Sequence, residues 1–119
     1  MAVIALLVAQ GCARAPRPRQ PAQRVPAAVP ASYTVTAYCM GTTTAAGTRV
    51  APGVVAADPK VLPLGTVIRL AGLAGRYNGT YTVMDTGSKI RGRRLDLYLR
   101  DCREAIRFGR RTGRVSIVR

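Results

Sequence analysis

The stretch that decides the fold is VMDTGSKIRGRRLDLYL, residues 83–99. At both of its ends, apolar and polar residues alternate with a period of two, which is typical of β-strands. Between the ends, a small-residue turn, Asp-Thr-Gly-Ser, leads into the basic run KIRGRR. The stretch therefore predicts two short strands joined by a polar loop, with Asp85 where the first strand ends and Asp96 inside the second.

The same alternation continues outward along the chain. There are six candidate strands, separated by turns rich in Gly, Pro and Asn: SYTVTAY (32–38), GVVAA (53–57), TVIRL (66–70), TYTVM (80–84), LDLYL (95–99) and RVSIV (114–118). One segment is typical of a helix, because Asp101 is a candidate N-cap, Glu104 completes a capping box, and CREAIRFG ends in a Gly. Six strands and one short helix predict a mainly β fold, a compact barrel that closes on itself.

The amino-terminal residues are expected to lie outside this fold. Residues 1–12 contain an apolar run, AVIALLVA, that is too short to span a bilayer, and they end in Gly11-Cys12, as a signal peptide would. Cys12 also resembles the lipid-accepting cysteine of bacterial lipoproteins, although Gln10 departs from that pattern. A plain export signal is the alternative. Residues 13–31 hold five prolines, four arginines and no acid, so they predict an extended linker before a folded domain at 32–119.

Charge and residue types limit the partners. With 19 Lys and Arg against 5 Asp and Glu, the net charge is +14, which favours polyanions such as nucleic acid, anionic lipid or bacterial wall polymers. Nucleic acid is disfavoured, because the export signal points outside the cytoplasm and no base-stacking motif is present. The sequence has no His and three Cys. It therefore excludes a His-based triad and predicts neither a metal site nor a cofactor.

The Asp-Thr-Gly-Ser turn at residue 85 has three readings. It is the active-site signature of aspartic proteases, but the basic run after it is a poor sequence for the apolar floor on which two carboxylates share a proton. It is also a common turn, in which Asp85 would accept hydrogen bonds from the backbone N–H of Gly87 or Ser88. In the third reading, the Asp85 carboxyl projects from the end of a strand into a groove and serves as an acid.

Three aspartates in order favour the third reading: Asp58 in VAADPKVLPLGT, Asp85 in VMDTGSKIRG and Asp96 in RRLDLYL. This pattern resembles the three-aspartate domain family, and TAYC (36–39), TAAG (44–47) and EAIRFGRR (104–111) match the same family in the same order. The resemblance covers roughly residues 33–118. It implies a six-stranded double-psi β-barrel, similar to the catalytic barrel of a membrane-bound lytic transglycosylase.

The resemblance also implies an activity on peptidoglycan strands. A lytic transglycosylase cleaves the β-1,4 bond between N-acetylmuramic acid and N-acetylglucosamine and leaves a 1,6-anhydro sugar. Asp85 would be its catalytic acid and base. The alternative is a non-catalytic wall-binding or wall-loosening barrel similar to the expansins. Either function places the protein outside the cytoplasm, in the periplasm or cell envelope, and lipidation of Cys12 would make it an outer-membrane lipoprotein.

The other two aspartates have weaker signals. Asp58 precedes Pro59 and is expected to hold a turn by accepting from neighbouring amides. Asp96 stands between Leu95 and Leu97, so strand geometry places it on the opposite face from those leucines. There it either orients Asp85 or contacts substrate, or it is a solvated charge.

Three further residues are candidates for substrate binding. Thr44 matches the family's Thr-Ala position and either donates to a sugar or is an ordinary loop residue. Lys89 and Arg91 either bind the carboxylates of peptidoglycan stem peptides or form a solvated edge that discourages strand pairing.

Two cysteines are expected to form a disulfide. Export to an oxidising compartment leaves only Cys39 and Cys102 in the folded part, one at the end of a strand and one at the start of the helix. Two buried thiols are the alternative.

Overall fold

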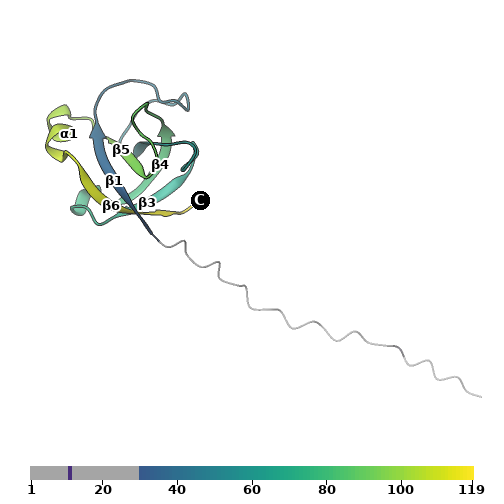
Figure 1. The fold of residues 1–119 in the computed structure, drawn as a ribbon. Coiled ribbons are helices and arrows are strands. Elements are labelled where there is room, and N and C mark those ends of the chain that lie inside the picture. Colours follow the sequence, from purple (N-terminus) through teal and green to yellow (C-terminus); the bar gives the residue numbers. More distant parts are fainter. Residues whose placement is uncertain (1–10, 12–29) are drawn as a thin grey trace, which may run out of the picture.

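The computed structural model describes residue 11 and residues 30–119 (Figure 1). Apart from residue 11, the predicted signal peptide at 1–12, with its lipidation site at Cys12, lies outside these described residues, as does the predicted linker at 13–31 except for residues 30–31. No helix in the described part is long and apolar enough to cross a membrane.

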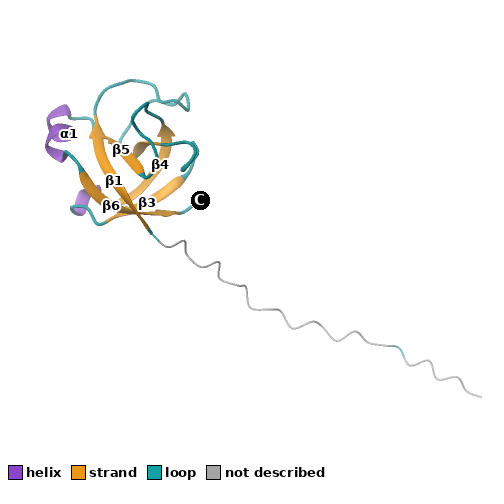
Figure 2. Cartoon of the chain, in the orientation of Figure 1, coloured by secondary structure: helices purple, strands orange, loops and turns teal. Residues whose placement is uncertain are grey.

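The strands and helices, in chain order, are β1 (Ala31–Tyr38), β2 (Val54–Ala57), β3 (Val67–Ala71), a 3₁₀ turn η1 (Gly75–Tyr77), β4 (Gly79–Asp85), β5 (Arg94–Tyr98), α1 (Cys102–Phe108) and β6 (Arg111–Ile117). The six strands form a closed barrel in the order β1-β5-β2-β4-β3-β6. The β1–β5 and β2–β4 pairs are parallel and the other four pairs are antiparallel. The prediction of a mainly β, six-stranded closed barrel with one short α-helix is confirmed (Figure 2).

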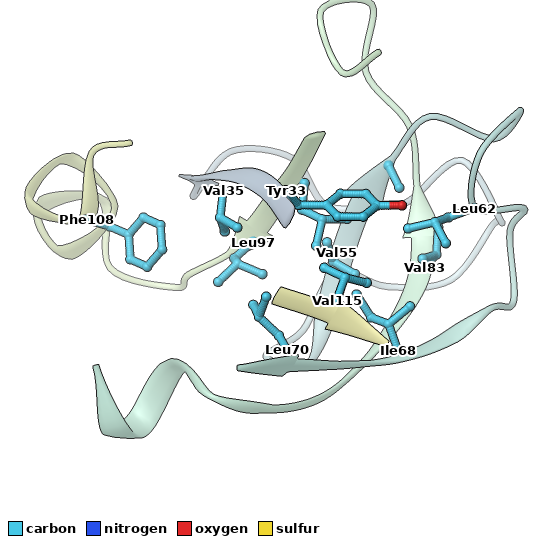
Figure 3. Close-up of a cluster of buried hydrophobic side chains, with 12 residues drawn as sticks. Tyr33, Val35, Val55, Leu62, Ile68, Leu70, Val83, Leu97, Phe108 and Val115 are labelled. Carbon is cyan, nitrogen blue, oxygen red and sulfur yellow. The ribbon is translucent and has the colours of Figure 1, made fainter. Parts of the chain in front are cut away.

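The core lies inside the barrel and is made of aliphatic side chains from alternate strand positions. Val35, Val55, Val83 and Leu97 are fully buried, and they come from β1, β2, β4 and β5. Figure 3 shows these side chains converging with others from β3 and β6. Because the alternate residues point inward, the residues between them face away from the core. That outward face carries the polar residues of the candidate site.

The helix α1 packs outside the barrel against β1 (Figure 2). Asp101 caps it as predicted, since its carboxylate accepts from the backbone N–H of Arg103 and Glu104. The expected capping box is not completed, because the Glu104 carboxylate accepts from Tyr77 and Arg76 on η1 instead. The helix thereby ties η1 to the barrel.

A disulfide joins the end of β1 to the start of α1. It links Cys39 to Cys102, whose Cα atoms are 5.1 Å apart, and it closes a loop with a sequence separation of 63 residues. The bond follows directly after Tyr38, the last residue of β1.

Gly113 on β6 has no room for a side chain. A Cβ added there would lie 2.9 Å from Cδ1 of Leu70 and 3.3 Å from Cγ2 of Val35, and both of those side chains are buried. We expect Gly113→Ala to lower the free energy of unfolding by roughly 1–3 kcal/mol in urea denaturation. The double variant Gly113→Ala, Leu70→Val should lose less than the sum of the two single changes, because Val lacks the crowding methyl group. Strictly additive losses would contradict this crowding.

Candidate active site

Two carboxylates share one outward row of the barrel. Backbone pairing aligns Thr36 of β1 with Asp96 of β5, Asp96 with Ala56 of β2, and Ala56 with Asp85 of β4. Residues paired directly across neighbouring strands point to the same face of a sheet. With one strand between them, the Cα atoms of Asp85 and Asp96 are roughly 10 Å apart. Ala56 lies between the two carboxylates in this row and is itself buried, at 4% exposure.

A β-bulge turns Asp85 into this row. Val55 pairs with Val83, but the next residue of β2, Ala56, pairs with Asp85, so that Met84 is the extra residue on β4. Strict alternation from the buried Val83 would have pointed Asp85 into the core. The inserted residue shifts the alternation by one position and brings the carboxyl to the outer face, as bulges near active sites commonly do.

Three donors hold the carboxylate of Asp85. The Tyr38 hydroxyl donates to Oδ2 at 3.0 Å, and the backbone N–H groups of Ala45 and Thr86 both donate to Oδ1 at 3.0 Å. The amides of Gly87 and Ser88, the donors expected for a simple turn, are not among them. Burial raises the pKa of the Tyr38 hydroxyl above its ordinary value, and the hydrogen bond to Asp85 raises it further. Tyr38 is therefore a proton donor in this pair.

The Asp96 carboxylate accepts fewer hydrogen bonds than that of Asp85. Its Oδ1 accepts from the Thr36 hydroxyl at 2.9 Å, and within residues 30–119 its Oδ2 accepts no hydrogen bond. Among these residues, the only side-chain nitrogen or oxygen that is both buried and without a hydrogen-bond partner is Nε of Arg94. Because Oδ2 of Asp96 also has no partner but is not in that class, it is not fully buried and contacts solvent. Burial raises the pKa of Asp96, and the nearby Asp85 charge adds to the rise, whereas Thr36 and Arg94 oppose it.

Thr44 belongs to the loop that covers Asp85. Its side chain is 5% exposed, and its hydroxyl pairs with that of Thr48 at 2.8 Å. The same hydroxyl accepts from the Thr48 N–H at 3.2 Å. The next two residues contact β4, because Ala45 N–H donates to Asp85 and Ala46 N–H donates to the Met84 carbonyl. Thr44 thus shapes a loop that reaches the site through backbone amides, and its own hydroxyl is already in use.

Asp58 lies outside the row of the other two aspartates. Its side chain is 7% exposed and sits in the turn after β2, where Oδ1 accepts from the Lys60 N–H at 3.0 Å and Oδ2 accepts from the Gly92 N–H at 2.9 Å. The second bond ties this turn to the loop between β4 and β5. These backbone donors, first Gly92 and then Lys60, lower the pKa of Asp58.

Asp58→Asn is expected to destabilise the fold at neutral pH, because an amide nitrogen would face one of the two N–H donors. The lowered folded-state pKa means that the unfolded chain takes up a proton first as the pH falls. The stabilisation from the carboxylate is therefore present above about pH 4 and is lost as the pH falls through the folded-state pKa. Melting temperatures of both proteins measured against pH check this. A difference in melting temperature between the two proteins that stays as large in strong acid would contradict this expectation.

The loop between β4 and β5 presents its cations to solvent. Lys89 and Arg91 are exposed, while Ile90 between them is buried. Ile90 packs over Gly87, where an added Cβ would lie 2.8 Å from the isoleucine Cγ1. The loop is thus fastened by Ile90 and by the bond from Gly92 to Asp58, and its basic side chains stay free to meet a ligand.

Sequence reasoning missed the roles of Thr36 and Tyr38. Both lie in the TAYC motif, and their spacing of two residues already placed them on one face of the strand. Nothing local indicated that Tyr38 would reach Asp85, which is 47 residues away in sequence. In the described part of the chain, no group of three or more Cys, Asp or Glu residues is arranged to hold a metal ion.

Part of this chain is similar to known sequences. The family model of the 3D domain matches residues 53–119. YabE of Bacillus subtilis (strain 168), a protein named for cell wall shaping, is 34% identical over 65 residues, which are 55% of this chain and 15% of YabE.

Solved structures with a similar fold include two lytic transglycosylases. LtgG of Burkholderia pseudomallei has a TM-score of 0.55 and 26% identity, over 65% of this chain and 26% of LtgG. MltA of Escherichia coli has a TM-score of 0.53 and 22% identity, over 63% of this chain and 26% of MltA. A structure of MltA with bound chitohexaose gives a TM-score of 0.53 at 19% identity, over 63% of this chain and 27% of that protein. The chain therefore spans about a quarter of these enzymes, and the MltA likeness shows the fold.

Proposed function

Because this chain belongs to the 3D-domain family, we propose that it cleaves peptidoglycan as a lytic transglycosylase. The bond cut is the β-1,4 link between N-acetylmuramic acid and N-acetylglucosamine, and the product is a 1,6-anhydro sugar. Support comes from the two lytic transglycosylases with a similar fold and from the chitohexaose, a glycan, bound to MltA. The likeness to YabE supports a place of action in the cell envelope. Lipidation of Cys12 is part of this proposal.

The observation that carries the proposal is the outward row in which Ala56 separates two carboxylates. Oxocarbenium-like transition states of glycan cleavage need an acid at the leaving oxygen and negative charge near the anomeric carbon. A half-buried Asp96 with a free oxygen and a raised pKa suits the first task. The carboxylate of Asp85, held by three donors, suits the second.

This division of roles differs from the sequence-based hypothesis, which made Asp85 the acid. Both oxygens of Asp85 already accept hydrogen bonds from the protein. Asp96 has an oxygen free to face a glycosidic bond. We therefore assign proton transfer to Asp96, with Asp85 as its anionic partner and Tyr38 as the residue that positions Asp85.

The reaction then needs one proton and no water. Protonated Asp96 donates to the bridging oxygen as the bond from that oxygen to C1 of muramic acid breaks. The 6-hydroxyl of the same muramic acid attacks C1, and the Asp96 carboxylate takes up the hydroxyl proton. The acid is thus restored. Lys89 and Arg91, exposed on the neighbouring loop, are proposed to bind stem-peptide carboxylates.

A non-catalytic wall-binding barrel is the second candidate. The observation that favours it is the set of exposed cations, since Lys89 and Arg91 bind an anionic wall polymer without any proton transfer.

Digestion of purified sacculi separates the candidates. We expect the full-length protein to release muropeptides whose mass is one water lower than that of a hydrolysis product, as a 1,6-anhydro ring requires. Release of hydrated ends would indicate hydrolysis by the carboxylate pair instead. Sedimentation with sacculi and no soluble product would support the wall-binding barrel and reject the enzyme.

A further inference from the structure

The outer face of α1 combines apolar and basic side chains. Ile106 and Arg107 follow Arg103 by three and four residues, which places the three side chains on one side of the helix. All three are exposed, and Ile106 is 80% exposed. The opposite side holds Ala105 and Phe108, which are buried against the barrel. The exposed isoleucine is therefore not needed for packing α1.

Met40 extends this surface across the disulfide. It is 76% exposed and lines a shallow hollow of about 250 Å³ together with Ile106, Ala105 and the two bonded cysteines. We call Met40, Arg103, Ile106 and Arg107 the α1 patch. Met40 and Ile106 are the two most exposed large apolar side chains in the described part of the chain, and they share one hollow. Adjacent apolar residues on a soluble surface commonly mark an interaction site.

The arginines of the α1 patch are available for an external anion. The only ion pair among residues 30–119 joins Arg76 to Glu104. Glu104 pairs with Arg76 and accepts from Tyr77, and Asp101 caps the helix, so neither forms an ion pair with the patch arginines. The surface thus places two exposed apolar side chains next to two arginines that form no ion pair within the described residues.

We propose that the α1 patch docks on the surface of an anionic lipid bilayer. Met40 and Ile106 would enter the boundary between headgroups and acyl chains, while Arg103 and Arg107 pair with lipid phosphates. A hydrated polyanion, such as a phosphate-rich wall polymer, would engage the arginines but gain nothing from the two apolar side chains. The combination of exposed apolar side chains with neighbouring cations favours a bilayer. This inference is independent of the peptidoglycan chemistry proposed above.

A single tryptophan reports the contact directly. The chain contains no Trp, so Ile106→Trp places one reporter in the patch, and Val61→Trp places one at a control site that is 40% exposed in the turn after β2. With full-length protein and phosphatidylglycerol vesicles, we expect a blue shift and quenching by brominated lipid at position 106 and neither at position 61. Equal responses at both positions, or none at 106, would overturn the proposal.

Vesicle sedimentation then separates the two kinds of contact. Arg103→Gln with Arg107→Gln should weaken binding roughly 10- to 30-fold, and Met40→Ser with Ile106→Ser should weaken it roughly 10-fold or more. The control, Arg69→Gln with Arg114→Gln, removes the same charge from exposed positions on β3 and β6 and should have a much smaller effect. The proposal is rejected if the Met40 and Ile106 substitutions leave vesicle binding unchanged, or if both arginine pairs weaken binding equally. The protein would then attract polyanions in general, and the α1 patch would not be a bilayer site. Circular dichroism checks that each variant folds.

Discussion

Asp96→Asn is expected to lower the release of 1,6-anhydro-muropeptides from purified sacculi by roughly 100- to 10,000-fold, the range typical of a lost general acid and base. Asparagine keeps the size of the side chain and can still accept from Thr36 at Oδ1. An amide NH₂ group then takes the place of the free Oδ2, and it has no acidic proton to transfer. Product release is measured by mass spectrometry after incubation with full-length protein.

Asp85→Asn is the matched comparison for this result. It should leave measurable product, because Asp96 still transfers the proton, but the yield should fall since the anionic partner is gone. The reverse order, with Asp85→Asn inactive and Asp96→Asn active, would contradict our assignment and restore Asp85 as the acid. Loss of activity in both variants without loss of folding would indicate that the carboxylates act as a coupled pair.

Stability gives a second readout for Asp96 that does not depend on activity. Its folded-state pKa is raised, so the folded chain takes up a proton more readily than the unfolded chain. The stability from this group is fully present below the ordinary carboxyl pKa of about 4 and is lost as the pH rises through the folded-state pKa. Asp96→Asn avoids that loss and should melt higher than wild type at neutral pH. This advantage should disappear in acid.

Removal of the disulfide should cause the largest loss of stability. For a sequence separation of 63 residues between the two cysteines, the chain-entropy model gives a contribution of about 4 kcal/mol. We therefore expect Cys39→Ser with Cys102→Ser to lower the free energy of unfolding by about that amount in urea denaturation. Because Tyr38 precedes Cys39, the same change frees the end of β1 that carries the donor to Asp85. Activity should fall with stability.

Reduction provides the control for this double variant. Wild type in a reductant should unfold at the same urea concentration as the double variant, whose own unfolding the reductant should not alter. Alkylation and intact-mass measurement of protein purified from the periplasm without reductant should find Cys39 and Cys102 unmodified. Two free thiols in that protein would contradict the predicted disulfide in the cell.

The local elements of this protein are determined by the sequence alone. Six alternating segments predicted the six strands to within a few residues, because side-chain direction repeats every two residues and depends only on neighbours along the chain. The helix start at Asp101 was readable for the same reason, since the aspartate caps amides two and three residues ahead. The aspartate pattern likewise identified the family.

The tertiary structure alone decided which aspartates share a row and which donors each one has. Asp85 and Asp96 share a row because β4 and β5 both pair with β2, and because a bulge at Met84 turns Asp85 outward. Strict alternation from the buried Val83 would have placed Asp85 in the core. Two of the donors to Asp85, Tyr38 and the Ala45 amide, come from segments 47 and 40 residues away. Strand pairing across such distances follows from packing of the whole barrel, so no local pattern specifies it.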